Sequence, residues 1–87
     1  MIEQHFQRAL AYEKLYKTDK AIDDYTKCLV FDKNCATAYF NRSGLFKMKF
    51  KYKEALDDIN MALKIEPKNL IFLTNKQLLS RDSGCSK

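Results

Sequence analysis

The chain has 87 residues, enough for one small domain, and its net charge of +5 comes from 16 basic and 11 acidic residues. Apolar residues make up 46% of the chain, which excludes an intrinsically disordered class. Both charge signs are interspersed along most of the sequence, so the charge alone does not indicate a nucleic-acid-binding protein. Only two glycines and one proline interrupt it, which predicts an all-α protein.

The sequence has no apolar run near the roughly 20 residues that a membrane helix needs, and its N-terminus lacks the hydrophobic core of a signal peptide. Its three cysteines are odd in number and show no CxxC spacing, which argues against a disulfide framework and a zinc site. We therefore expect a cytoplasmic protein with no membrane partner, no metal and no cofactor.

Apolar residues at helical spacing predict five helices in chain order: about 1–15, 19–31, 36–49, 52–65 and 70–79. The first helix begins without a capping residue, which suggests a segment of a longer protein. The fourth helix carries Ala55 and Ala62 on its apolar face, so a neighbouring helix is expected to pack closely there, and Pro67 ends it. Residues 80–87 contain no core-forming side chains and are predicted to be a disordered tail.

The sequence repeats with a period of 34 residues. At this shift Arg8 aligns with Arg42, and further matches are Ala21 with Ala55, Asp23 and Asp24 with Asp57 and Asp58, and Leu29 with Leu63. A two-helix unit of this length resembles the tetratricopeptide repeat. At the family's characteristic positions the second copy has residues that are mostly similar in kind: Tyr39, Arg42, Ser43, Phe46, Ala55, Ile59 and Pro67. The departures are Arg8 and Arg42 in place of leucine, His5 in place of a large aromatic residue, and Lys33 in place of proline.

The resemblance implies an α-α superhelix, or solenoid, in which residues 1–79 form one domain. Its parts would be two helix-turn-helix repeats, about 2–35 and 36–69, and one further helix at about 70–79. The family binds an extended peptide or a partner helix in a concave groove lined by the first helix of each repeat. The implied function is therefore protein–protein interaction as a scaffold, without enzyme activity. The matching groove residues are Phe6, Gln7, Leu10, Phe40, Asn41, Gly44 and Lys47.

One variant of the family grips the C-terminal carboxylate of chaperone tails with a clamp of lysine, arginine and asparagine side chains. Asn41 matches the middle asparagine of that clamp, but the other four places hold Phe6, Leu10, Ile71 and Asn75. The missing cations argue against a chaperone tail as the ligand. For Asn41 two interpretations remain open, a hydrogen bond to a ligand backbone or one to a neighbouring helix.

An alternative function is a purely structural array. The last helix carries Leu70, Leu73 and Leu78, which would be covered either by further repeats or by a second copy in a homodimer.

Two other patterns favour structural over chemical roles. Lysines alternate with Met48, Phe50 and Tyr52 over residues 47–53, a pattern that a nucleic-acid site would show. We favour packed aromatic side chains and solvated lysines there, and expect no nucleic-acid partner. The repeated aspartate pairs are expected to lie on a solvated face paired to lysines, because neighbours on a helix point about 100° apart and do not face each other.

Overall fold

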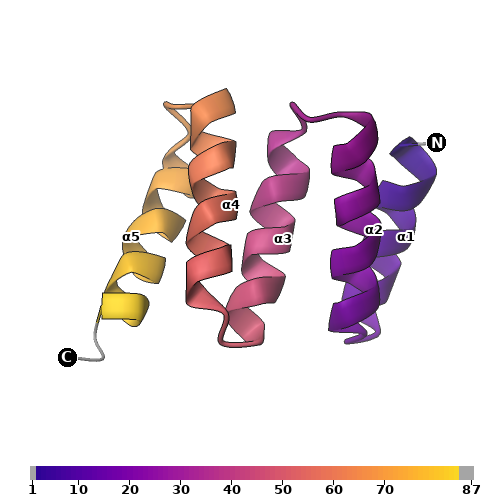
Figure 1. The fold of residues 1–87 in the computed structure, drawn as a ribbon, viewed down its shortest axis with the longest axis horizontal. Coiled ribbons are helices and arrows are strands. Elements are labelled where there is room, and N and C mark those ends of the chain that lie inside the picture. The colour runs from indigo at the N-terminus through magenta and orange to yellow at the C-terminus, as the bar shows by residue number, and fades with distance from the viewer. Residues whose placement is uncertain (1, 85–87) are drawn as a thin grey trace.

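The structure, a computed structural model, describes residues 2–84, and the side chains of residues 4–81 within that range. Five helices follow one another: α1 (Ile2–Lys14), α2 (Thr18–Phe31), α3 (Ala36–Met48), α4 (Tyr52–Ile65) and α5 (Leu70–Gly84) (Figure 1). No strand occurs within residues 2–84. The all-α prediction is confirmed, and the first four helices begin and end close to the predicted residues.

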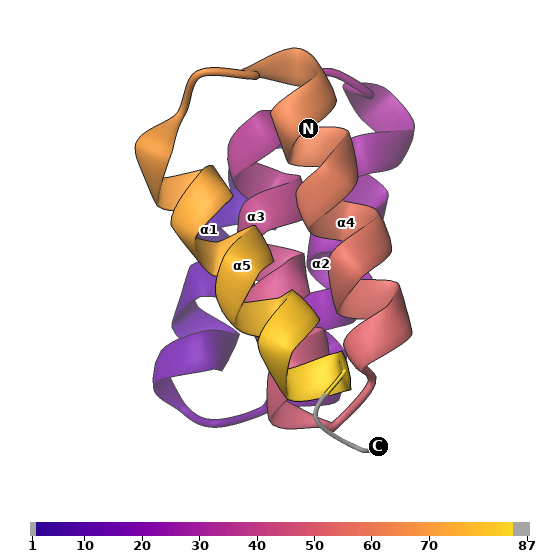
Figure 2. The same ribbon diagram turned by 90° about the vertical axis from the view of Figure 1, so that its left-hand side faces the viewer.

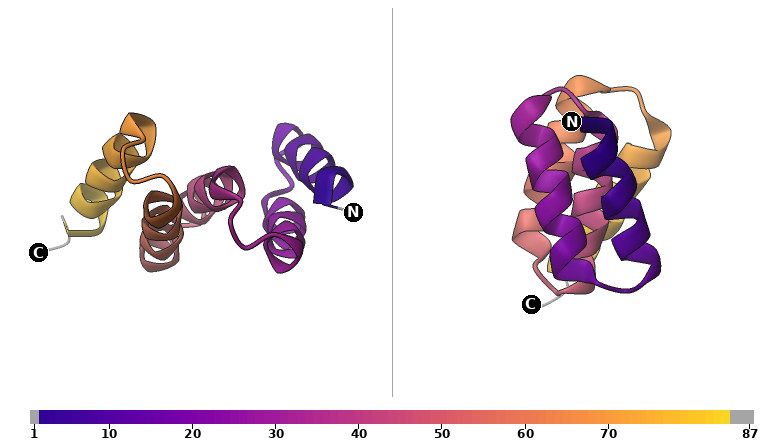
Figure 3. Two further views of the ribbon diagram at one scale, coloured as in Figure 1. Left: turned by 90° about the horizontal axis from the view of Figure 1, so that it is seen from above. Right: turned by 90° about the vertical axis from the view of Figure 1, so that its right-hand side faces the viewer.

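The helices form two hairpins and one further helix, each packed on the one before it. Helix α1 packs on α2 and α3 on α4, while α2 contacts α3 and α4 contacts α5 across the junctions. Seen from above, α1, α3 and α5 lie along one side of the molecule and α2 and α4 along the other (Figure 3). This is the predicted α-α superhelix.

Small residues allow the helices to approach closely. The six positions that the repeat predicts to be small are all at most 2% exposed: Ala9, Ala21, Cys28, Ser43, Ala55 and Ala62. The larger side chains of Tyr25, Ile59 and Leu79 fill the space that remains between the helices. Because the packing is close, a larger or smaller side chain at these positions is expected to destabilise the fold.

Helices α1 and α3 end in the same way, with an aromatic residue in the left-handed backbone region. Tyr16 has φ 60° and Phe50 has φ 63°. After each of them the chain folds back, since the Lys17 N–H donates to the Tyr12 carbonyl and the Lys51 N–H to the Phe46 carbonyl, both at 2.9 Å. Glycine usually occupies this place, because a side chain there costs about 1–2 kcal/mol.

The predicted packing of aromatic side chains at the corner between α3 and α4 is wrong for Phe50. Its side chain is 78% exposed, and it touches Tyr52 edge-on with ring centroids 6.4 Å apart. The reversed backbone at Phe50 carries the ring outward, a direction that the helical pattern of the sequence does not reveal.

Helix α5 continues to Gly84, five residues past the predicted end at Leu79. The tail prediction is therefore wrong for residues 80–84, which contain no proline to stop the helix, and residues 85–87 lie outside the described residues. At its start, the Asn69 side chain accepts hydrogen bonds from the N–H groups of Ile71 (2.9 Å) and Phe72 (3.2 Å). Within residues 2–84 no helix is both long and apolar enough to cross a membrane.

Candidate functional site

The predicted groove residues lie on the row of helices formed by α1, α3 and α5, here called the inner face. Helix α1 carries Phe6, Gln7 and Leu10, and helix α3 carries Phe40, Asn41, Gly44 and Lys47. Their spacings of one, three and four residues place each set on one side of its helix. The two helices share one side of the molecule in Figure 3, so the fold brings the sets to the same side.

The aromatic members of this set pack against neighbouring helices. Phe6 meets Tyr25 of α2 edge-on, with ring centroids 5.6 Å apart, and Phe40 meets Phe72 of α5 at 5.0 Å. Both Phe6 and Phe40 are half-buried, as is Leu10, which packs against the core. These three side chains therefore hold the helices together and leave only part of their surface for a ligand.

Asn41 hydrogen-bonds a neighbouring helix in this structure. Its Nδ2 donates to the Tyr25 hydroxyl at 3.2 Å, and that hydroxyl donates to the Glu13 carboxylate of α1. Tyr25 is fully buried, and burial, followed by the bond to Glu13, raises the pKa of its hydroxyl far above the usual range. The hydroxyl therefore stays neutral, and its hydrogen bond restrains the orientation of the Asn41 amide.

Tyr25 and Glu13 belong to the site, although the repeat pattern assigned no polar role to Tyr25. The position aligned with Tyr25 in the second hairpin is Ile59, which has no polar group. The sequence did contain a sign of this role: Tyr25 places a hydroxyl at a core position where the second repeat has an apolar side chain, and a buried hydroxyl needs a hydrogen-bond partner.

Of the predicted groove residues, Gln7 and Gly44 are open to solvent, and Asn41 and Lys47 are half-buried. A Cβ atom added at Gly44 would meet nothing within 4 Å. The packing of the chain therefore places no steric demand for glycine at this position.

The aspartate pairs are not both solvated, and the prediction is wrong for Asp24 and Asp58. Asp24 is 2% exposed and accepts hydrogen bonds from Arg8 Nε (2.8 Å) and Nη2 (2.9 Å). Asp58 is 5% exposed and accepts two bonds of 2.7 Å from the Nε and Nη2 of Arg42. These two-pronged ion pairs clamp α1 to α2 and α3 to α4, so the arginines that depart from the family pattern replace an apolar contact with a charged one.

The other member of each pair, Asp23 and Asp57, is exposed as expected, and Asp23 lies 3.7 Å from Lys27. The Arg8 hydrogen bonds hold the pKa of the Asp24 carboxyl below its usual range, against the opposing effect of burial. The buried carboxylates of Asp24 and Asp58 are therefore structural partners of the two arginines.

Helix α5 turns its buried side, with Phe72 and Leu79, toward the rest of the molecule. Its other side carries the three predicted self-association residues: Leu70 (75% exposed), Leu73 (38%) and Leu78 (41%). No described part of the chain covers this side in Figure 2. A shallow cavity of about 240 Å³ lies along α5, lined by Leu70, Ile71, Thr74 and Asn75.

Neither metal binding nor thiol chemistry is indicated by the described side chains. They include no group of three or more His, Cys, Asp or Glu residues that could hold a metal ion. Cys28 is buried and Cys35 half-buried. Burial raises the pKa of the Cys28 thiol, which disfavours the reactive thiolate form.

No protein-family model matches the chain. Among solved structures, the Arabidopsis OM64 TPR domain is 30% identical with a TM-score of 0.87, over 93% of this chain and 67% of that one. The chain belongs to the tetratricopeptide repeat (TPR) family. The first TPR of Spaghetti (RPAP3), bound to the HSP90 peptide SRMEEVD, superposes with a TM-score of 0.91 over 97% of this TPR chain and 67% of its own, at 24% identity.

Mouse sperm-associated antigen 1 is 36% identical to this TPR chain over 62 residues, which are 71% of the chain. The same residues account for only 7% of the mouse protein. The chain thus corresponds to a small part of that relative.

Proposed function

We propose that this TPR segment is a protein-interaction module that binds an internal peptide segment or a helix of a partner protein on its inner face. It would act as a scaffold in the cytoplasm, without catalysing a reaction. The contacts would come from Gln7, Asn41, Gly44 and Lys47, with the exposed edges of Phe6, Leu10 and Phe40 as apolar anchors.

The observation that carries the proposal is the exposed glycine in the middle of α3. Gly44 costs the helix about 0.5–1 kcal/mol relative to alanine. The space above it is open, so no packing contact within the described chain accounts for it. A partner backbone passing close to the helix would need that space. Asn41 and Lys47 lie one turn to either side and could bond such a backbone.

The composition of the face favours a ligand without a free C-terminal carboxylate. The RPAP3 domain holds an HSP90 peptide that ends in Val-Asp. Here the clamp places contain Phe6, Leu10, Ile71 and Asn75, which offer no cation to a carboxylate. We therefore expect SRMEEVD to bind weakly or not at all, whereas C-terminally amidated internal peptides should bind.

The proposal can be tested by selecting peptides from a display library that bind the TPR segment. The affinities of the selected peptides, synthesised with amidated C-termini, are then measured by fluorescence anisotropy. Gly44→Gln fills the open space with a side chain that suits a helix, so binding should fall about tenfold or more. Asn60→Gln, at an exposed place on the outer helix α4, is the matched control and should bind as the original chain does. Peptides that bind the Gly44→Gln variant equally well would contradict the proposal.

Gly44→Ala separates stability from binding. It should raise the free energy of unfolding in urea by about 0.5–1 kcal/mol, because α3 gains helix propensity and loses no contact. A lower stability would show that glycine is needed by the fold itself, and would remove the reason for invoking a ligand there.

A second candidate is a structural segment that stacks on further repeats or pairs with another copy through α5. The exposure of Leu70, Leu73 and Leu78 favours it, since solenoid units leave an apolar face until a neighbour covers it. Sedimentation equilibrium should then show a dimer at high concentration that Leu73→Asp converts to a monomer. A monomer at every concentration would count against self-association.

A further inference from the structure

The net positive charge of the chain is concentrated at one edge. We define the basic edge as residues 14–20 and 47–53, the two turns that follow α1 and α3 with their flanking residues. It contains seven lysines and one aspartate, a net charge of +6, whereas the whole chain carries +5 and the remainder therefore −1. Counting the flanking Glu13 and Glu54 as well, the edge still holds +4. Charges of both signs are interspersed along the sequence, but the fold brings an excess of lysines together at this edge.

The same edge exposes apolar side chains. Tyr16 is 83% and Phe50 78% exposed, and so are the nearby Leu15 (63%) and Met48 (56%), one residue before Tyr16 and two before Phe50. The two aromatic residues occupy the positive-φ positions at which glycine would be less strained. The chain thus keeps an exposed ring at both places at a cost in stability.

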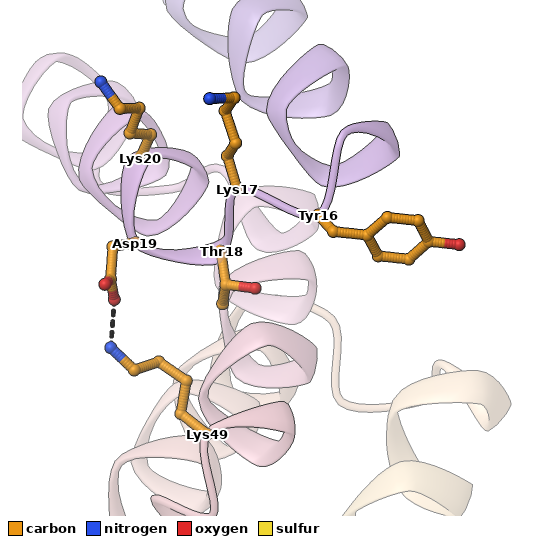
Figure 4. Close-up of a pocket in the computed structure, with 6 residues that line it drawn as sticks. All are labelled: Tyr16, Lys17, Thr18, Asp19, Lys20 and Lys49. Carbon is orange, nitrogen blue, oxygen red and sulfur yellow. Dashed lines mark hydrogen bonds and ion pairs between the residues drawn. The ribbon is translucent and has the colours of Figure 1, made fainter.

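The two turns form one continuous surface. Both lie at the lower end of the molecule in Figure 1, and the Lys49 ammonium pairs with the Asp19 carboxylate across the gap between them. A hollow of about 360 Å³ between the turns is lined by Tyr16, Lys17, Thr18, Asp19, Lys20 and Lys49. Figure 4 shows the Tyr16 ring pointing away from the helices that frame this hollow.

We propose that the basic edge binds the surface of an anionic lipid bilayer, with the lysines contacting lipid phosphates and carboxylates and with Tyr16 and Phe50 entering the interface. Each lysine near such a surface adds attraction, the amphipathic tyrosine ring favours the boundary between headgroups and acyl chains, and phenylalanine supplies apolar area that can be buried there. The expectation of no membrane partner was based on the absence of a spanning segment, which does not bear on binding to the membrane surface. Lys47 belongs to both surfaces, whereas Gln7, Asn41 and Gly44 lie outside the basic edge, so surface binding would leave most of the inner face free for a protein ligand.

Two features of the edge favour a bilayer over a single-stranded nucleic acid. Leu15 and Met48 are aliphatic, and aliphatic side chains insert into lipid but give bases no ring to stack on. The turns also protrude at the end of the molecule, whereas single strands are commonly held along a charged groove. A protruding surface with charged and apolar side chains fits a soft, flat partner.

Co-sedimentation with vesicles tests whether the lysines of the basic edge bind anionic lipid. The chain should bind vesicles containing about one-third phosphatidylserine and leave pure phosphatidylcholine vesicles unbound. The double variant Lys17→Glu/Lys51→Glu should lose about tenfold or more in affinity. Lys33→Glu/Lys68→Glu carries the same net charge but changes exposed lysines at the opposite end, so it should bind within about twofold of the original chain.

Tyr16→Gly/Phe50→Gly tests the rings without harming the fold, since glycine suits both backbone positions. It should be more stable and yet bind about tenfold more weakly to the anionic vesicles. The chain has no tryptophan, so Phe50→Trp supplies a single reporter whose emission should shift to the blue with these vesicles. Val30→Trp, at an exposed place on the opposite end, should not shift.

Three results would overturn the proposal. One is equal loss of vesicle binding in both lysine variants, which would show attraction by net charge alone. Another is an unshifted Phe50→Trp emission on bound vesicles. The third is tight, salt-sensitive binding of oligothymidylate without vesicle binding, which would assign the edge to nucleic acid.

Discussion

Asn41 and Asn75 occupy the same place in helices one repeat apart, yet they form different hydrogen bonds. Asn41 donates across the junction to Tyr25 of α2, whereas Asn75 donates to the Ile71 carbonyl of its own helix at 2.8 Å. The residue aligned with Tyr25 in the second hairpin is Ile59, which offers no acceptor. Two junctions with the same helix placement therefore differ in polarity because of one side chain on the neighbouring helix.

The ion pairs show the opposite relation, since both hairpins have them but in different surroundings. The Arg42 side chain is 18% exposed and that of Arg8 52%. Arg42 also donates to Thr26 of α2 at 3.0 Å and lies over the rings of Tyr39 and Phe46. The second arginine is thus the more buried one and has an additional partner on the preceding hairpin, so we expect its ion pair to contribute more to stability.

The largest expected difference between the hairpins comes from removing each arginine. Arg42→Met leaves the buried Asp58 carboxylate without its partner and should lower the free energy of unfolding by about 2–3 kcal/mol. Arg8→Met should cost less, because half of the Arg8 side chain is exposed and water screens its charge, although Asp24 itself is buried. Urea unfolding followed by circular dichroism measures both. Adding Asp58→Asn to Arg42→Met should restore most of the loss. Equal losses for Arg8 and Arg42 would show that the greater burial of Arg42 does not increase the contribution of its ion pair.

Removal of the Tyr25 hydroxyl tests the polar junction. Tyr25→Phe should destabilise the chain by about 1–2 kcal/mol, since Asn41 and Glu13 lose a shared partner. Thermodynamic coupling between Tyr25→Phe and Asn41→Ala should be measurable in a double-mutant cycle. Asn75→Ala, which breaks only a bond within its own helix, should change stability by no more than about 0.5 kcal/mol. Additive effects of Tyr25→Phe and Asn41→Ala would contradict the network.

The helix ends after α1 and α3 should respond alike, because both have an aromatic residue at positive φ. Tyr16→Gly and Phe50→Gly should each raise the free energy of unfolding by about 1 kcal/mol. Thermal unfolding of the two single variants and the double variant measures the gains, which should add. A loss of stability in either variant would mean that its ring makes a stabilising contact.

The fold was predictable because helix periodicity and the repeat of small residues act locally and agree with each other. Ala21 and Ala55 recur at the repeat distance, and both are fully buried where helices approach. The predicted end of α5 came five residues too early, because the end of the apolar pattern was taken as the end of the helix. Backbone hydrogen bonding continues through polar residues when no breaker intervenes.

The side-chain partners were harder to predict, because they depend on which face of a helix meets which neighbour. Asp23 and Asp24 are chemically identical, and the buried one is distinguished by the Arg8 guanidinium, 16 residues earlier, which donates to it. An arginine at a place where the family has leucine was a usable signal, since a charge next to the core requires a partner. The Asn41 contact could not be found in this way, because an amide suits either a ligand or a helix.

The smallest expected effect is the pH dependence of the first ion pair. Because the Arg8 hydrogen bonds keep the pKa of Asp24 lower in the folded than in the unfolded chain, Asp24 contributes stability above the unfolded pKa of about 4 and loses it as pH falls further. The stability difference between the original chain and Asp24→Asn should therefore be constant near neutral pH and shrink below about pH 4. Asp23→Asn, at the exposed neighbour, should show a much smaller difference throughout. A difference for Asp24→Asn that does not change with pH would mean that the variant acts through packing, and that the carboxylate charge in the first hairpin contributes nothing to stability.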